Sequence, residues 1–265
     1  MKRLWFIIPI LFCCVAASFY LPHRRLAFRP SATPGGFTPT DVANMIAWYK
    51  ADALTGASVG DLVTNWFDSG ANGYTLTQDA AARQPYYTNN AGLFNNQPWI
   101  QWDGSSDRLL FGGTNIFNQP NTIFAVCRYE GTGSTGVIAD GTNATMSHAV
   151  RFLSNWRFAL YAPTQINGAV NSATNLVGYL AEFTFDHPGN SSTIFTNGVS
   201  YVNSTSPGTN HLAGIVIGSA GGVSGASFFK GAIAEVIIYN SDVSAGDRTS
   251  LRTYFTTKYG AYSGW

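Results

Sequence analysis

The chain beyond residue 40 is a succession of short apolar runs separated by turn residues. β-Branched and aromatic residues are concentrated within the runs, and Gly, Asn, Asp and Ser stand between them. Several runs alternate apolar and polar positions with a period of two, which is typical of a strand with one face in the core. This pattern predicts strands at 46–49, 99–102, 122–128, 149–152, 157–161, 179–185, 192–196, 200–203, 214–218 and 232–239.

Local signals predict a hairpin and a helix. Asn197 and Gly198 stand between two alternating runs, and both residue types accept positive φ, which predicts a tight type I′ turn. Near the C-terminus, Ser244 is a candidate helix cap with Asp247 three positions later, and Gly260 is a candidate end. Between them, apolar and basic residues recur at helical spacing, at Leu251, Tyr254, Phe255 and Lys258. One helix after many strands predicts an all-β fold, a two-sheet antiparallel jelly-roll sandwich with a short C-terminal helix.

The first 39 residues have a different character. Lys2 and Arg3 precede an apolar run at 4–21, expected to be a helix, and a Pro/Gly-rich linker follows at 22–39. The run is typical of a signal peptide, and it is also long enough for an uncleaved membrane anchor through residues 4–21. The expected organisation is a signal peptide or anchor at 1–21, the linker at 22–39 and one sandwich domain at 40–265. We therefore expect a secreted protein or one displayed on a cell or virion surface.

Charge excludes one class of partner. Only 11% of residues are charged, and five of the 15 cations lie in the first thirty residues, which contain no acid. The remainder has ten cations (15 − 5) against 14 acids, a net charge of −4 (10 − 14). Without a basic stripe to displace counterions, the domain is not expected to bind nucleic acid. Cys127 lies in a β-rich run without a neighbouring base, so we interpret it as a buried apolar side chain.

Four segments, in order, resemble the concanavalin A-like lectin/glucanase superfamily, in its laminin G-like and pentraxin-like branches. The run 46–52 (IAWYKAD) is similar to the opening strand of these domains. The run 66–73 (WFDSGANG) resembles their loop of the pattern W-x-D-x-S-G-x-G, with one residue inserted before Asn72. The segments 84–86 (QPY) and 97–107 (QPWIQWDGSSD) resemble the Q-P and F-D-G-x-x-D elements, and 229–239 (FKGAIAEVIIY) a late strand. The resemblance implies two antiparallel sheets packed face to face, a fold that carries lectins, adhesion modules, glycanases and lyases.

The acids do not match a glycanase pattern. An enzyme of this superfamily would carry three alternating acids on one strand, but Thr184 stands between Glu182 and Asp186, and Glu235 is alone in its strand. The four histidines show no metal-type pairing. We therefore expect no catalytic activity and predict a non-catalytic carbohydrate-binding or surface-recognition module. The alternatives are a structural or adhesion protein of a virion or cell surface that does not bind glycans, and a glycoside hydrolase or polysaccharide lyase.

Candidate ligand residues lie close to turns. Aromatic faces stack on the C–H surfaces of sugars, and planar polar groups bond to hydroxyls, so a glycan or cell-surface polysaccharide is the expected partner. The candidates for this binding are Trp66, Asn72, Tyr74, Trp156 and Arg157. The alternative for the tryptophans is core packing, which we expect for Trp48, Trp99 and Trp102 and also for Trp66 beneath its loop.

Calcium is the one cofactor that the loops suggest. Asp68, Asp103 and Asp107 could join loop carbonyls in an oxygen cage, and we expect the loops 66–72 and 103–107 to meet at one edge of the sandwich. The alternative is a plain turn in which Asp103 accepts hydrogen bonds from its own backbone. Both interpretations stay open on the sequence.

Overall fold

The computed structural model describes residues 36–260, apart from 90–91, 133, 144, 172, 204 and 222–226. The apolar run at 1–21 and most of the linker therefore lie outside the described residues. The chain from Phe37 onward forms one compact unit. Within the part described, no helix is long and apolar enough to cross a membrane.

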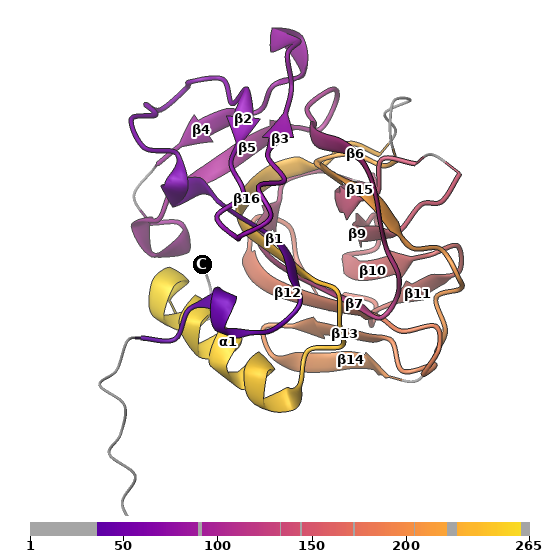
Figure 1. Cartoon of the computed structure of the whole chain (residues 1–265). Coiled ribbons are helices and arrows are strands. Elements are labelled where there is room, and N and C mark those ends of the chain that lie inside the picture. Colours follow the sequence, from indigo (N-terminus) through magenta and orange to yellow (C-terminus); the bar gives the residue numbers. More distant parts are fainter. Residues whose placement is uncertain are drawn as a thin grey trace, which may run out of the picture. The chain divides into compact units, whose positions relative to one another are not determined.

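Two antiparallel sheets make up this unit, as predicted (Figure 1). Sheet A has the strand order β14-β13-β12-β7-β16-β5-β4, with β1 also paired to β16. Its strands are β1 (Met45–Lys50), β4 (Tyr86–Thr88), β5 (Trp99–Asp103), β7 (Asn121–Tyr129), β12 (Gly178–Phe185), β13 (Thr193–Thr196), β14 (Val199–Asn203) and β16 (Lys230–Tyr239).

Sheet B has the order β11-β10-β9-β8-β15-β6-β3-β2. Its strands are β2 (Asn65–Trp66), β3 (Leu76–Thr77), β6 (Leu109–Phe117), β8 (Gly136–Asp140), β9 (Ala149–Leu153), β10 (Arg157–Tyr161), β11 (Gln165–Asn167) and β15 (Leu212–Ile217). Short 3-10 turns complete the described elements: η1 (Pro39–Asp41), η2 (Ala51–Ala53), η3 (Ala81–Arg83) and η4 (Phe94–Asn96).

Strand β16 organises sheet A. One of its edges pairs with β7 along nearly the whole strand. Its other edge is divided, because β5 pairs with its first residues and β1 with its last ones. Lys230 lies opposite Asp103 of β5, and Val236 lies opposite Tyr49 of β1. The strands of segments 46–52 and 97–107 are thus aligned end to end along β16.

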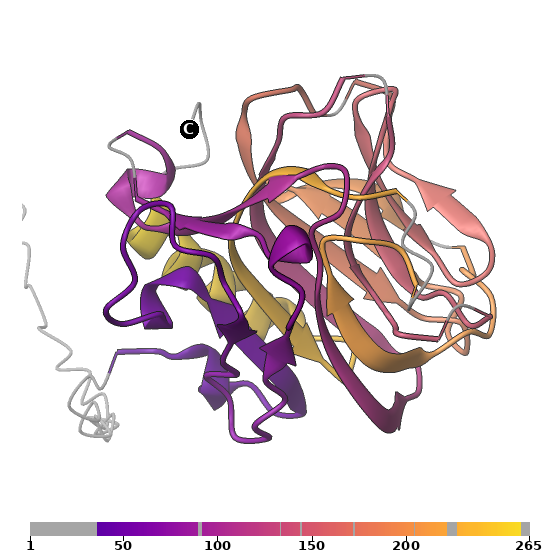
Figure 2. The same ribbon diagram turned by 90° about the horizontal axis from the view of Figure 1, so that it is seen from above.

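Two apolar layers hold the unit together. The larger lies between the sheets and includes Tyr49, Phe152, Phe158 and Phe183. The smaller lies on the outer face of sheet A, where helix α1 (Ala245–Tyr259) covers the sheet (Figures 1 and 2). Alternation along the strands separates the two layers, because successive side chains point to opposite faces.

The local predictions of this region are confirmed. Asn197 and Gly198 have φ of 49° and 78°, as a type I′ turn requires, and they join β13 to β14. Ser244 caps α1, since its side chain accepts a hydrogen bond from the backbone N–H of Asp247, and Gly260 ends the helix. All ten predicted strands are present, with bounds shifted by a few residues.

Candidate functional site

A cleft of about 390 Å³ opens beside strand β2. One wall is the turn that follows β1, with Leu54 and Thr55, and the other is the segment that leads into β2, with Leu62 and Asn65. Phe67 and Tyr87 also line it. The cleft thus lies where the chain passes from sheet A to sheet B.

Backbone pairing builds the second wall. The N–H of Gly60 donates to the carbonyl of Tyr87, and the N–H of Tyr87 donates to the carbonyl of Asp61. Leu62 forms an isolated bridge with Tyr86, so this segment extends the edge of β4. Gly60 has a φ of +93°, a left-handed conformation that glycine adopts without strain, and it turns the chain into this pairing. The wall is therefore fixed by main-chain hydrogen bonds and does not depend on the cleft side chains.

The cleft combines exposed apolar surface with polar groups. Phe67 is 55% exposed and Leu62 is 51% exposed. The exposed side chains of Thr55 and Asn65 supply hydrogen-bonding groups beside them. Asp61 is the one charged residue in the lining, and its carboxylate accepts the backbone N–H of Ser58. The site therefore offers an apolar platform and neutral polar atoms, without a cation.

Trp66 is buried and Phe67 is the aromatic residue in the open. Trp66 is fully buried between the sheets, as the core-packing alternative predicted, and it contacts Tyr49. Its neighbour Phe67 points to the other side, because the extended chain alternates. Sequence reasoning selected the larger ring and missed Phe67, although the same period of two could have distinguished them.

Asn72 and Tyr74 hold the following loop in place. The Asn72 amide donates to the carbonyls of Met45 and Ile46, at 3.0 and 2.8 Å. Tyr74 is half-buried and stacks on Phe111, with ring centroids 4.7 Å apart. These contacts give both residues a packing role, and neither lines the cleft.

Trp156 and Arg157 lie in the turn between β9 and β10. Trp156 has a φ of +58° and packs its half-buried ring against Phe152. Arg157 opens β10 opposite Leu153. The structure therefore separates these two candidates from Trp66, Asn72 and Tyr74, which belong to the loop beside β1.

Asp68 fastens its loop to β1. Its Oδ1 accepts the backbone N–H groups of Trp48 and Gly70, both at 2.8 Å, and its Oδ2 accepts that of Tyr74 at 3.2 Å. Asp68 also forms an isolated bridge with Tyr49. Its carboxylate thus accepts the Trp48 N–H at the edge of β1, as the carbonyl of a neighbouring strand would.

Asp103 and Asp107 close a turn on each other. The N–H of Asp103 donates to Asp107 Oδ2 at 2.8 Å, and the N–H of Asp107 donates to Asp103 Oδ1 at 3.1 Å. Burial raises the pKa of Asp103, but hydrogen bonds from Ser105, Ser106 and Asp107 outweigh it and lower the pKa to about 2. For Asp107 burial dominates and raises the pKa to about 6. This is the self-capping turn that was the alternative to a metal site.

The two loops do not meet at one edge as predicted. Asp68 lies beside Tyr49 of β1, and Tyr49 in turn lies opposite Val236 of β16. Asp103 of β5 lies opposite Lys230, the first residue of β16. Six residues of β16 separate these levels, about 20 Å at about 3.3 Å per residue. The three carboxylates therefore do not fit one calcium cage, and the described residues contain no group of three or more His, Cys, Asp or Glu placed to hold a metal ion. Calcium binding by any one of these carboxylates stays an untested prediction.

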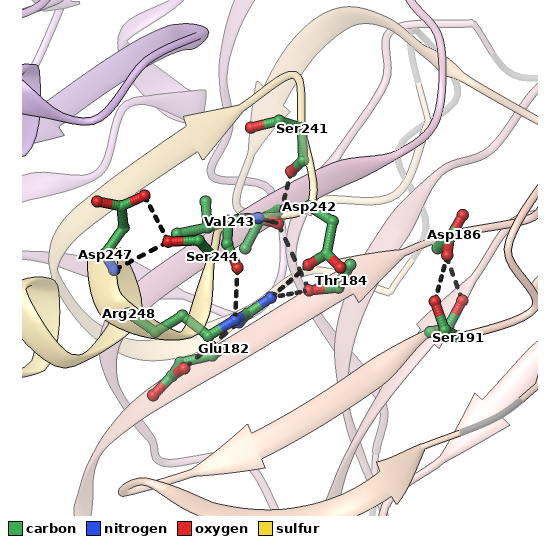
Figure 3. A network of polar contacts seen from close by, with 12 residues as sticks. Glu182, Thr184, Asp186, Ser191, Ser241, Asp242, Val243, Ser244, Asp247 and Arg248 are labelled. Carbon is green, nitrogen blue, oxygen red and sulfur yellow. Dashed lines mark hydrogen bonds and ion pairs between the residues drawn. The ribbon is translucent and has the colours of Figure 1, made fainter.

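Glu182 and Asp186 are four residues apart, which would place them on the same face of a strand, but their surroundings differ (Figure 3). Glu182 is fully buried and accepts two hydrogen bonds from Arg252 of α1, at 2.7 and 2.8 Å, with Arg248 at 3.6 Å. Asp186 lies beyond the end of β12, where its carboxylate accepts bonds from Gly189 and Ser191. One acid thus anchors the helix, and the other closes a turn.

Glu235 anchors the other half of the helix. This fully buried carboxylate accepts hydrogen bonds from Trp48 Nε1 at 2.6 Å, Tyr259 Oη at 2.6 Å and Lys258 Nζ at 2.8 Å, and also from Tyr254. Four side chains therefore converge on it beneath α1.

The other buried candidates lie as predicted. Cys127 is a free, buried thiol between the sheets, and burial raises its pKa. Trp48, Trp99 and Trp102 are all in the core. These residues are therefore assigned to packing.

Comparison with known proteins gives likenesses of fold. No protein-family model matches the chain, and no curated protein matches it. Domain 4 of AbnA, an extracellular arabinanase from Geobacillus stearothermophilus solved in complex with arabinotriose, aligns with 82% of this chain and 99% of its own length, at 14% identity and a TM-score of 0.50.

Two further structures align at lower scores. The module CBM40 of a Ruminococcus gnavus sialidase, solved with α2,3-sialyllactose, covers 51% of this chain and 82% of its own length, at 12% identity and a TM-score of 0.44. A Trypanosoma rangeli sialidase covers 87% of this chain and 35% of its own length, at 12% identity and a TM-score of 0.49. At 14% identity, the likeness to AbnA domain 4 extends to the fold alone.

Proposed function

We propose that this chain is a non-catalytic carbohydrate-binding module of the laminin G-like type, and that it holds a neutral sugar chain in the cleft beside β2. The observation that carries the proposal is the exposed pair Phe67 and Leu62 at a cleft with polar walls. The fold likeness to AbnA domain 4, which was solved with arabinotriose, supports it at the level of architecture.

The position of exposed apolar surface supports a ligand here. Large apolar side chains that stay in water mark binding surfaces when they gather in one place. Val59, Leu62, Phe67 and Tyr86 are each at least 40% exposed and belong to the cleft or to the segments that frame it. A pyranose or furanose ring presents a C–H face that packs on such a surface while its hydroxyls reach polar side chains.

The charge of the cleft favours a neutral ligand. Its lining contains no Lys or Arg, and Asp61 would repel a carboxylate or sulfate. Thr55 and Asn65 can bond to hydroxyls without charge. The glycan class that fits is therefore an uncharged polysaccharide such as an arabinan, a xylan or a glucan.

Affinity electrophoresis of the purified protein through gels that contain neutral arabinan, xylan or β-glucan tests the proposal. We expect retardation by at least one of them, and Phe67→Ala should abolish it. Ile116→Ala removes an equally exposed apolar side chain from β6 and is the matched control. Retention of binding by Phe67→Ala, or equal loss in both variants, would contradict the site.

The non-catalytic part has its own test. Incubation of the same polysaccharides with the protein should release no new reducing ends over a day. Release that persists in Phe67→Ala would indicate an enzyme whose active site lies elsewhere.

A further inference from the structure

The outer face of strands β9, β10 and β11 carries two arginines that form no ion pair with the described residues. These strands lie side by side at one edge of sheet B (Figure 1). Phe152, Phe158 and Leu160 point into the layer between the sheets. The alternate residues, including Arg151 and Arg157, therefore lie on the opposite, outer face.

Strand register sets the layout of this face. Ala159 lies at its centre, opposite Arg151 of β9 and opposite Asn167 of β11. Arg157 and Tyr161 lie two residues before and after it on the same strand, about 7 Å away. We call the four side chains around Ala159 the arginine face. Because alanine contributes only a methyl group, the guanidinium of Arg151 reaches across it to the ring of Tyr161.

The two guanidinium groups have no carboxylate partner. Among the described residues, neither Arg151 nor Arg157 forms an ion pair, and the Nε atom of each is buried without a hydrogen-bond partner. Arg151 lies over the ring of Tyr161, 4.3 Å from its centroid, and its one hydrogen bond is a long contact of 3.4 Å to Ser147. Aromatic stacking orients a guanidinium but leaves its in-plane donors free.

The nearest acid is already saturated. Asp140, at the end of β8, accepts hydrogen bonds from the backbone N–H groups of Gly141, His148 and Gly221 and from Ser147 Oγ. It is fully buried, and no acid occurs in the sequence between residues 141 and 181. Burial also lowers the pKa of Arg151, which shows that its charge is partly removed from water. A partly desolvated cation with free donors is a site for an anion from outside.

We infer that the arginine face binds the carboxylate or sulfate group of an acidic polysaccharide, with Arg151, oriented by the ring of Tyr161, as the bidentate donor and Arg157 as a second cation on the same face. Planar guanidinium forks match planar or tetrahedral oxyanions and give shorter, stronger bonds than neutral donors. This site is separate from the neutral cleft beside β2 and does not depend on it. Two isolated cations in a domain of net charge −4 favour a single acidic group over the repeated phosphates of a nucleic acid.

Three dextrans with one backbone separate the relevant chemistries: dextran sulfate, carboxymethyl-dextran and unmodified dextran. Titration of the full chain, followed by calorimetry, should show binding to one or both charged polymers. The double variant Arg151→Gln, Arg157→Gln should lower that affinity at least tenfold. Tighter binding of one charged polymer identifies sulfate or carboxylate as the preferred group. Dextran itself is expected to bind equally weakly to the wild-type protein and the double variant.

The control removes a charge elsewhere. Arg83→Gln deletes an exposed cation outside the arginine face, and we expect its affinity to stay within twofold of wild type. Five cations precede residue 30 and attract acidic polymers in every variant, so the comparison between variants is the decisive quantity. Arg151→Lys keeps the charge without the fork and should still lose severalfold affinity.

Three results would overturn the inference. Equal losses in Arg83→Gln and the double variant would show that only net charge matters. Unchanged affinity in the double variant, with near-UV circular dichroism like wild type, would show that the face is not used. Stronger displacement by duplex DNA than by either charged dextran would identify a nucleic acid as the partner. Phe67→Ala should leave the affinity for charged dextran unchanged, which distinguishes this site from the neutral cleft.

Discussion

On the outer face of sheet A, two acids are fully buried, and the helix that covers them supplies the cations. Glu182 and Glu235 are fully buried, and Arg252 and Lys258 of α1 bind them. On the outer face of sheet B, at β9–β11, the charged side chains are arginines, and no carboxylate of the described residues forms an ion pair with them. On sheet A, the ion pairs between the buried acids and the helix stabilise the fold. The face of sheet B leaves its charge available to a ligand, so substitutions on the two faces should affect different measurements.

The largest effect is expected at Glu235. Glu235→Gln removes the charge on which Lys258, two tyrosines and Trp48 converge, and it leaves the largely buried Lys258 paired only with the more exposed Asp52 among the described residues. We expect the free energy of unfolding to fall by about 3–5 kcal/mol, the range for breaking a buried ion pair from one side. Urea denaturation measures it.

Asp52→Asn is the control for that change. Asp52 contacts the same Lys258 at 2.9 Å, but its side chain is 34% exposed. Its loss should cost less than about 1 kcal/mol, as for other surface pairs. A loss as large as that of Glu235→Gln would contradict the idea that the buried end of this network carries the stability.

A smaller loss is expected at Glu182. Glu182→Gln weakens two charge-assisted hydrogen bonds from Arg252, whose side chain is partly exposed and can return to water. We expect a cost of about 2 kcal/mol. Hydrogen exchange should show the amides of α1 opening more readily than those of β12, because the helix loses its anchor while the sheet keeps its ladder.

The opposite behaviour is expected on sheet B. Arg151→Gln should change the free energy of unfolding by no more than about 2 kcal/mol, the value of a cation–π contact that is partly removed from water. Thermal melts in the absence of ligand provide the measurement. A loss comparable to that of Glu235→Gln would mean that Arg151 is a structural residue, and the contrast between the two faces would fail.

Asp107 sharpens the comparison as an acid that is buried without a cation. Its pKa of about 6 lies above that of the unfolded chain, so the folded state holds the proton more tightly, and this group's contribution to stability falls as pH rises from about 4 to about 6. Asp107→Asn should remove that fall. At pH 7 its net effect should be below about 1 kcal/mol, since the loss of a buried charge is offset by a weaker bond from the Asp103 N–H.

Asp103 contributes a pH dependence of stability opposite to that of Asp107, and urea denaturation at a series of pH values measures both. Its pKa of about 2 lies below the unfolded value, so it stabilises the fold above about pH 4, and this contribution is lost as pH falls from about 4 to about 2. Asp103→Asn should remove only the loss of stability between about pH 4 and about pH 2. If both variants altered the same pH range, the assignment of the two shifts would be wrong.

Local signals made the sandwich and its helix predictable, and tertiary contacts explain what was missed. Strand β6 was not predicted, because Gly112 and Gly113 interrupt its pattern like a turn. In the structure the ring of Phe111 fills the space beside Gly113, where a Cβ would lie 2.3 Å from the ring. The glycine is therefore required by packing inside a strand, which a single sequence does not show.

The candidate sites were less predictable than the fold. Trp66 and Asp68 belong to segments that resemble the superfamily, but their side chains serve the core and the loop backbone. Phe67 and Arg151 could be placed on outward faces by alternation alone. Whether another element covers those faces depends on how distant segments pack, so exposure became known only with the structure.

Strand β16 has a consequence for synthesis of the chain. It is formed by Lys230–Tyr239, close to the C-terminus, yet it lies between β7 on one side and β5 and β1 on the other. Until these residues have left the ribosome, three strand edges have no partner, and exposed edges invite pairing between chains. Sheet A can therefore close only after Tyr239 has been made. A product truncated before residue 230 would keep its open strand edges and aggregate instead of forming a smaller fold.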